Sequence, residues 1–438
     1  MTEPELTFGW RRTGAPVASA RTDDICFLDA DRGWAVNSNG QILHTEDGAV
    51  TWTRQFSVRG AYLRCVGFAN DRVGWVGTLA ATRRLFATVD GGATWTGVES
   101  LPPDAPPAIC GLSVVNGRVV YGSGTNFPNR PAGVVKTIDG GATWTAVDMS
   151  AHATLLVDIH FQDELRGWVV GGKADVPNPR RDDVVPVVLS TDDGGLTWQN
   201  RLAGIQPALP MGEWGWKIHF VDENVGFVSL ENFHDGAVLK TVDGGHTWAR
   251  MPVNDPQGNA NLEGVGFADP QLGWVGGWGN RDGSDGFTSE TRDGGVTWAD
   301  ANEVGKLLNR FRVIREPDLV VYASGDTVYK YSALADAANA DGGDETNDDA
   351  VDVSKGRFPL AIPVVAPPDA KSLRVDIWDR FGEHLATMLN DDAPAAGGAR
   401  RFTWSGEISS GGSAEPGAYI YRVTIDDHAE SRVVAIEA

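Results

Sequence analysis

The chain has 438 residues, 42% of them hydrophobic, and its 59 acidic residues against 37 basic ones give a net charge of −22. This length and composition predict a soluble chain with a large core, and the acidic balance argues against nucleic acid as a partner, because phosphate binding needs clustered Lys and Arg. No apolar run approaches the roughly 20 residues that a membrane-spanning helix needs, so no membrane span is expected.

The N-terminal segment, residues 1–6, is acidic and has neither the basic region nor the apolar stretch of a secretory signal. We therefore expect a cytoplasmic location by default, with a surface-exposed assembly as the alternative if the chain is exported by a leaderless route or trimmed from a longer one. The three cysteines, Cys26, Cys65 and Cys110, are odd in number and lack metal-type spacing. They are expected to be buried, inert thiols, without disulfide or zinc.

One signature, Thr-x-Asp-Gly-x-x-Thr-Trp, recurs six times in the first three hundred residues. A recurrence of this period indicates a supersecondary unit stacked on its own copies. An Asp-Gly turn between two apolar runs predicts a hairpin, because Gly accepts positive φ and the carboxylate can accept backbone N–H bonds. We therefore assign a structural role to the aspartates at its centre, which are Asp47, Asp90, Asp139, Asp193, Asp243 and Asp293.

Each repeat unit has four short runs typical of strands; in the second unit they are 63–68, 73–78, 85–88 and the run that Thr94 opens. A seventh unit lacks the signature and has only three such runs, 311–314, 319–323 and 327–331. We expect the N-terminal run 7–12, which carries Trp10, to supply the fourth, because a closed ring has no open sheet edge. The sequence predicts an all-β fold, with a seven-bladed β-propeller over residues 1–333.

Residues 334–356 are rich in Asp, Ala, Gly and Asn, and we interpret them as an acidic linker. Calcium binding there is the alternative, although the Asp-x-Asp-x-Asp-Gly order with a closing Glu is missing. Residues 357–438 form a second unit, in which apolar and polar residues alternate over 373–378 and further strand-like runs follow at 419–425 and 432–436. This pattern predicts a C-terminal immunoglobulin-like β-sandwich.

Most signatures follow a second recurring element, such as Gly33-Trp34-Ala35-Val36 and Gly273-Trp274-Val275-Gly276. The pair resembles the Asp-box, or bacterial neuraminidase repeat, of β-propellers of the photosystem II stability and assembly factor type. In the C-terminal unit, 375–382, 402–406 and 416–423 resemble the immunoglobulin-like domain of flagellar hook-capping proteins and are similar to sorting domains of type IX secretion. These resemblances imply a rigid disc that docks proteins.

The irregular insertions of the repeats are all expected on one face of the disc, where binding usually resides. Three tryptophans in these insertions have no role in the repeat, so we predict an exposed aromatic contact surface, with loop packing as the alternative. The candidate binding residues are Trp214, Trp216, Trp278, Arg180, Arg181, His234 and Arg281.

Asp-box propellers include sialidases and endoglucanases, so a catalytic function is an alternative hypothesis. A sialidase needs three arginines, a Tyr–Glu pair and an acid Asp, and its Arg-Ile-Pro element is missing here; residues 315–317 read Arg-Glu-Pro at the wrong end. Glu213 could pair with Asp235 or Glu231, but no ordered catalytic set can be assembled.

We expect a noncatalytic protein-binding scaffold without cofactor or metal, docked through its β-sandwich to a multiprotein assembly. The alternative is a carbohydrate-binding or sialidase-like propeller at a cell surface, with a glycan as ligand.

Overall fold

A computed structural model describes residues 7–18, 20–58, 60–232, 234–255, 260–278, 288–301, 304–334, 354–367, 370–379, 384–391, 398–409, 411–414, 417–426 and 428–436. These residues form strands and one short 3-10 helix, η1 (Arg181–Asp183). Among them, no helix has the length and hydropathy that crossing a membrane would require. The expected acidic linker and its calcium alternative lie almost entirely outside the described residues, and so does Arg281.

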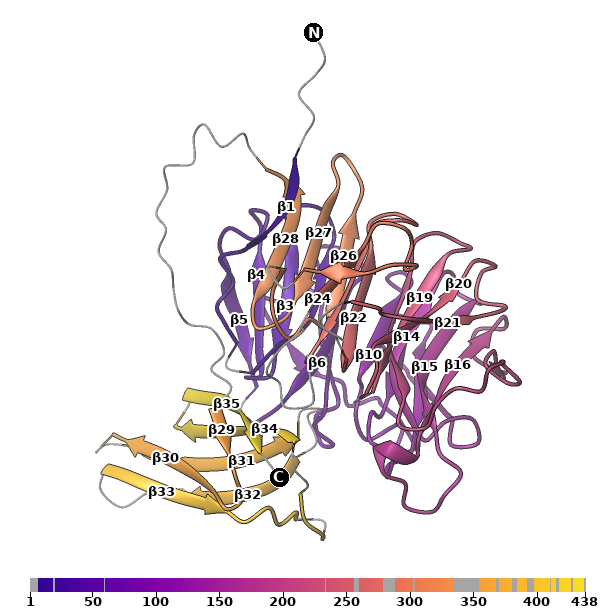
Figure 1. The fold of residues 1–438 in the computed structure, drawn as a ribbon. Helices are drawn as coiled ribbons and strands as arrows, with labels where there is room; N and C mark the ends of the chain where they lie inside the picture. The colour runs from indigo at the N-terminus through magenta and orange to yellow at the C-terminus, as the bar shows by residue number, and fades with distance from the viewer. Residues whose placement is uncertain are drawn as a thin grey trace.

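The N-terminal three quarters of the described chain fold into antiparallel four-stranded sheets, as expected of a β-propeller (Figure 1). Six of these sheets run in chain order. Their strands are β2 (Thr22–Phe27), β3 (Gly33–Asn37), β4 (Gln41–Thr45) and β5 (Thr53–Ser57); β6 (Leu63–Phe68), β7 (Gly74–Thr78), β8 (Leu85–Thr88) and β9 (Thr96–Gly97); β10 (Gly111–Val114), β11 (Val120–Gly124), β12 (Gly133–Thr137) and β13 (Thr145–Asp148); β14 (Leu155–Phe161), β15 (Gly167–Lys173), β16 (Val185–Thr191) and β17 (Gln199–Asn200); β18 (Trp214–Phe220), β19 (Gly226–Glu231), β20 (Ala237–Thr241) and β21 (Ala249–Pro252); β22 (Leu262–Phe267), β23 (Gly273–Gly277), β24 (Thr288–Thr291) and β25 (Ala299–Asp300).

A further sheet joins the two ends of this region. Its order is β1-β28-β27-β26, with β1 (Phe8–Arg12), β26 (Arg310–Ile314), β27 (Val320–Ser324) and β28 (Val328–Ala333). The N-terminal strand pairs antiparallel with β28, and Trp10 lies opposite Tyr331. The Trp10 ring packs at 5.1 Å from the ring of Trp274 and at 6.1 Å from that of Phe311. Strand β1 is therefore held by main-chain bonds on one side and by aromatic packing on the other.

The first strands of consecutive sheets lie side by side around a closed ring. Strand β2 contacts β6, β6 contacts β10, and the series continues through β14, β18, β22 and β26 back to β2. Because strands alternate in direction, the Asp-box hairpins share one face of the ring with the loops that join first and second strands. We call this the Asp-box face. The loops between second and third strands and the connections between sheets lie on the opposite face, which we call the insertion face.

Each Asp box uses its carboxylate inside its own turn. In the second box, the Thr88 hydroxyl donates to Asp90 Oδ1 at 2.8 Å, and the Thr94 hydroxyl and amide donate to Asp90 at 2.6 and 2.9 Å. The turn needs glycine, because Gly91 and Gly92 have φ of 76° and 91°. The bonds from Thr94 and Thr88 lower the pKa of Asp90 to about 2. The other five boxes repeat these bonds.

The C-terminal unit has two sheets. The larger contains β29 (Ser354–Gly356), β35 (His428–Ile436), β34 (Gly417–Ile425), β31 (Leu373–Asp379) and β32 (His384–Asp391) in that order, and the smaller pairs β30 (Leu360–Ala366) with β33 (Gly398–Trp404). Both sheets contribute to one core, which includes Ile362, Trp404, Val375 and Ile377. The alternation over 373–378 places Leu373, Val375 and Ile377 in this core, and the opposite side of the strand is also covered, because Asp376 and Trp378 are buried.

Candidate functional site

Charged side chains meet at the centre of the ring because the innermost strands carry β-bulges. The pairing of β2 with β3 skips Asp23, that of β6 with β7 skips Arg64, and that of β22 with β23 skips Glu263. A bulged residue is turned away from the regular alternation and can be aimed at a neighbour. We call the group formed by Arg21, Asp23, Asp24, Arg64, Asp158, Glu263 and Arg310 the hub.

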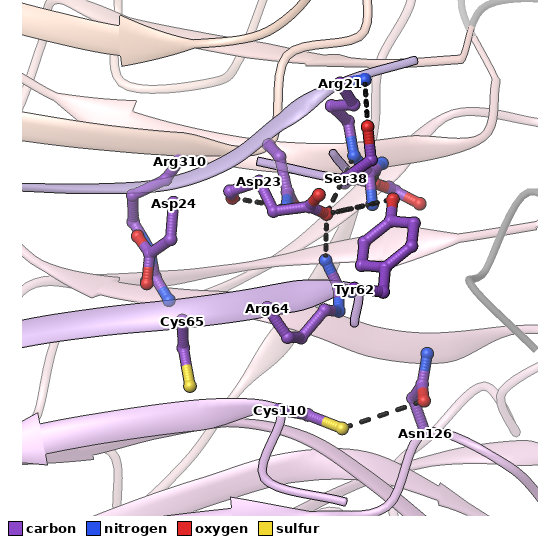
Figure 2. A network of polar contacts seen from close by, with 12 residues as sticks. Arg21, Asp23, Asp24, Ser38, Tyr62, Arg64, Cys65, Cys110, Asn126 and Arg310 are labelled. Atoms are coloured by element: carbon purple, nitrogen blue, oxygen red, sulfur yellow. Dashed lines mark hydrogen bonds and ion pairs between the residues drawn. The ribbon is translucent and has the colours of Figure 1, made fainter. Parts of the chain in front are cut away.

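One half of the hub is built around Asp23, and Figure 2 shows its contacts. Its Oδ1 accepts hydrogen bonds from Arg21 Nε at 3.0 Å and from Arg64 Nη1 at 2.8 Å. Arg21 also forms an ion pair with Glu263, whose other oxygen accepts a bond from Trp278 Nε1 at 2.8 Å. All of these side chains are fully buried. Because buried charges are tolerated only when they are paired, this arrangement is self-compensating.

The other half of the hub is centred on Arg310. Its guanidinium donates to Asp158 Oδ1 and Oδ2 at 2.6 and 2.9 Å, and to Asp24 Oδ1 at 2.9 Å. Although burial raises the pKa of Asp158, Arg310 brings it down to about 2. Lys217 lies buried near these groups, and burial followed by the charge of Arg310 lowers its pKa to about 8. Asp158 is therefore held as an ion by an arginine of another strand.

The predicted exposure of the three tryptophans is wrong. Trp214 and Trp216 belong to strand β18 rather than to a loop, Trp278 directly follows β23, and all three are fully buried. Trp216 lies under the guanidinium of Arg64 at 4.7 Å and donates to Asn309 Oδ1 at 2.8 Å. Trp278 lies 5.1 Å from the guanidinium of Arg21. These rings pack against buried cations, where cation–π attraction is strongest.

The other predicted binding residues are placed differently. Arg181 is half-buried, with its guanidinium 5.2 Å from the Trp214 ring and donating to Asn126 O at 2.9 Å. Arg180 and His234 are exposed on the insertion face. The structure thus joins Arg181 to Trp214 but leaves Arg180 and His234 at the surface.

Two insertions, one of which carries Arg180 and the other Met211, are joined to each other on the insertion face. The loop between β15 and β16 and the connection between β17 and β18 are joined by a bond from Gly212 N to Val184 O at 2.8 Å. They expose two apolar side chains, Val176 and Met211, the latter 70% exposed. Asn232, which holds the loop carrying His234, donates to Glu213 beside this connection at 2.8 Å. We call Val176, Arg180, Met211 and His234 the insertion surface.

The carboxylates considered for catalysis have structural partners. Glu213 is fully buried and accepts a forked pair of bonds from Arg250, with Nη2 to Oε1 at 2.8 Å and Nε to Oε2 at 3.0 Å. Glu231 is also fully buried, whereas Asp235 is exposed. The arginine fork occupies both oxygens of Glu213, whereas glycoside hydrolysis needs two carboxyl groups that face the substrate.

The Asp-box face exposes a different kind of residue. Every box presents one aliphatic side chain at one of the two variable positions flanking its Asp-Gly centre, with exposed fractions between 58% and 79%. These residues are Val50, Val89, Ile138, Leu196, Val242 and Val296. They are spread one to a sheet, and single exposed aliphatic residues are ordinary on protein surfaces.

The cysteines are free, with Cys65 and Cys110 buried and Cys26 half-buried. Burial raises the pKa of all three thiols, which keeps them protonated. Within the ranges that the structure describes, no group of three His, Cys, Asp or Glu side chains is placed to hold a metal ion.

Sequence reasoning missed the hub. A usable signal was present, because charged residues interrupt otherwise apolar strands: Asp23 and Asp24 precede Ile25, and Arg64 stands between Leu63 and Cys65. Lys, Arg, Asp and Glu are almost never fully buried unless paired, so such interruptions on several inner strands indicate mutual pairing.

Residues 3–147 match the model of a family described as photosynthesis system II assembly factor YCF48. Among solved structures, the chain is similar to YCF48 bound to a D1 peptide, with 16% identity and a TM-score of 0.53 over 75% of this chain and 97% of that one. It is also similar to YCF48 from Cyanidioschyzon merolae, with 18% identity and a TM-score of 0.53 over 74% of this chain and 98% of that one. No curated protein matches the sequence. These likenesses show the fold, a β-propeller of the photosystem II assembly factor type.

Proposed function

We propose that this chain is a noncatalytic protein-binding scaffold. In this proposal residues 1–333 are a seven-bladed β-propeller, residues 334–356 are an acidic linker, and residues 357–438 are an immunoglobulin-like β-sandwich that docks the disc to a larger multiprotein assembly. The closed series of inner strands and the pairing of β1 with β28 support seven blades. The two sheets around one core support the sandwich.

The hub is the observation that carries the noncatalytic part of the proposal. The centre of a propeller is a common place for a reactive site, yet here Asp23, Asp24, Asp158 and Glu263 are each bound by an arginine. A catalytic acid or base must reach the proton that it transfers. Side chains that are fully buried and bonded to each other hold the inner strands together instead.

Binding is then left to the surface, and the insertion surface is the best candidate. Its loops depart from the repeat, and they are positioned by a rigid ring, which is typical of binding loops. Exposed Met211 and Val176 beside Arg180 give the mixture of apolar and cationic groups that protein interfaces favour. One solved relative is named as bound to a peptide, which supports a protein partner here by analogy of fold alone.

The proposal is tested by capture on the full-length chain. A tagged Arg180→Ala/Met211→Ala variant is compared with the unmodified chain and with Leu196→Ala, which removes an exposed aliphatic side chain from the Asp box of the fourth sheet. We expect the unmodified chain and Leu196→Ala to recover the same stoichiometric protein, and the double variant to recover at least about tenfold less. Binding to a glycan array without a protein partner would instead support the carbohydrate alternative.

A further inference from the structure

The C-terminal unit packs against the insertion face of the propeller. Trp378 and Ile420 share one buried cluster with Ala20, Tyr62 and Leu307 of the propeller and with Trp278, which binds Glu263 of the hub. Figure 1 shows the C-terminal sheets against one end of the ring of sheets. The unit thus covers part of the face on which the insertions lie, and one apolar cluster joins the two units.

A cavity of about 240 Å³ lies at this boundary. The propeller contributes Tyr62, Phe127 and Arg130 to its wall, and the C-terminal unit contributes Arg374, Trp378 and His384. We call it the seam pocket. Neither unit can form it alone, because each supplies only part of the wall.

The seam pocket is cationic in an acidic protein. Among the described residues that line the pocket none is acidic, whereas Arg130 and Arg374 are basic. A third guanidinium, that of the buried Arg422, lies behind the wall, 4.7 Å from the ring of Trp378. The nearby carboxylate of Asp376 forms a forked ion pair with Arg374, through Nε to Oδ2 and through Nη2 to Oδ1 at 2.8 Å, and it also contacts His384 at 2.9 Å. Asp376 therefore offsets the charge of Arg374, and Arg130 supplies the cationic group that faces a ligand.

The shape and chemistry of the pocket indicate a carboxylate attached to a flat or branched apolar group. A guanidinium donates two parallel hydrogen bonds, which match the two oxygens of a carboxylate. Tyr62, Phe127 and Trp378 are buried at its edge and present ring surfaces. A cavity of roughly 150 Å³ holds benzene, so the volume suits a small aromatic or branched acid rather than a drug-sized ligand.

We propose that the seam pocket binds the carboxylate of a small apolar acid or of a peptide chain terminus, with Arg130 as its cationic contact. Both sources share the same chemistry. The proposal does not depend on the insertion surface, because the two are formed by different residues and are perturbed by different substitutions.

The test is calorimetric titration of the full-length chain with phenylacetate and with N-acetyl-Ala-Ala-Phe carrying a free carboxyl end. Each probe is compared with its amide, phenylacetamide or the amidated peptide. We expect both acids to bind and both amides to bind at least about tenfold more weakly, because the amide loses the charge-assisted bonds. Tighter binding of the peptide acid assigns the site to chain termini, and tighter binding of phenylacetate assigns it to small acids.

Two arginine variants make the result specific to the pocket. Arg130→Gln removes an exposed guanidinium from the wall, and Arg118→Gln removes an exposed one from the loop between β10 and β11 on the Asp-box face. We expect Arg130→Gln to weaken the acids by about tenfold and Arg118→Gln to leave them unchanged, with both variants melting as the parent does. Equal binding of acids and amides, no effect of Arg130→Gln, or tighter binding of inorganic phosphate than of either acid would overturn the proposal.

Discussion

Replacing Trp10 with Ala tests how strongly the N-terminal strand closes the ring. Trp10 is half-buried and packs against three aromatic rings, Trp274, Phe311 and Tyr331, at 5.1 to 6.1 Å. Replacing a fully buried Trp with Ala lowers the free energy of unfolding by about 3 to 5 kcal/mol. Because Trp10 is half-buried, we take half of that value and add the lost ring pairs, which gives a loss of about 2 to 3 kcal/mol. The effect should be local at first, because β28 (Val328–Ala333) then loses the partner that protects its amides.

Urea unfolding gives the free-energy change, and hydrogen exchange locates it. We expect amides of β28 to exchange faster in Trp10→Ala, while amides of β16 (Val185–Thr191), in a sheet across the ring, keep their protection. Trp10→Phe is the matched control, because it keeps a ring against Trp274 and should recover more than half of the loss. An unchanged free energy of unfolding with unchanged exchange in β28 would refute the closure by β1.

Three further predictions concern the Asp boxes, the hub and acid stability. Asp243→Ala removes the acceptor of the hydrogen bonds from Thr241 and Thr247. After allowance for exposure, it should lower the free energy of unfolding in urea by about 1 kcal/mol without weakening partner capture. Full stability with lost capture would contradict this. Trp216→Ala should cost about 3 kcal/mol or more with unchanged capture per folded molecule, and a stable variant that fails to capture would refute its structural role. Burial lowers the pKa of His160 to about 4 and of His219 to about 3, so below pH ~6.5 the unfolded chain binds protons that the folded chain does not. Urea stability should therefore fall as pH drops from about 6.5 toward 4, less steeply in His219→Gln, and a flat profile over this range would be inconsistent with the lowered pKa values of these two half-buried imidazoles.

The hairpin part of the fold could be predicted from sequence because its causes are local. An Asp accepting bonds from the next turn and two Gly at positive φ are specified within eight residues, as Asp90, Gly91 and Gly92 show. The inner strands could be predicted for the same reason, because each is a short apolar run, such as the fully buried strand that contains Val66. Each of these features lies within one repeat unit, and its recurrence in six copies of the signature strengthened the prediction.

The candidate site depended on contacts that no single repeat contains. Trp216 was interpreted as a loop residue because it follows a stretch rich in Gly and Pro, yet a bulge in β18 turns it onto Arg64 of another sheet. The burial of Trp278 could not be predicted from its repeat either, because its neighbour Trp378 belongs to a separate unit. The seam pocket exists only after the two units pack together, so periodicity and turn chemistry carried no information about it.

The most direct test of the scaffold account is hydrogen exchange of the full-length chain with and without its captured partner. Exchange is measured on the same peptides in both states, so each face of the disc serves as the other's control. We predict slower exchange on binding in residues 174–184 and 201–213, which carry Val176, Arg180 and Met211 of the insertion surface, and no change in the six Asp-box hairpins. Protection confined to the Asp-box hairpins, or protection at the hub strands β2 and β26 alone, would contradict a partner bound through the insertion surface.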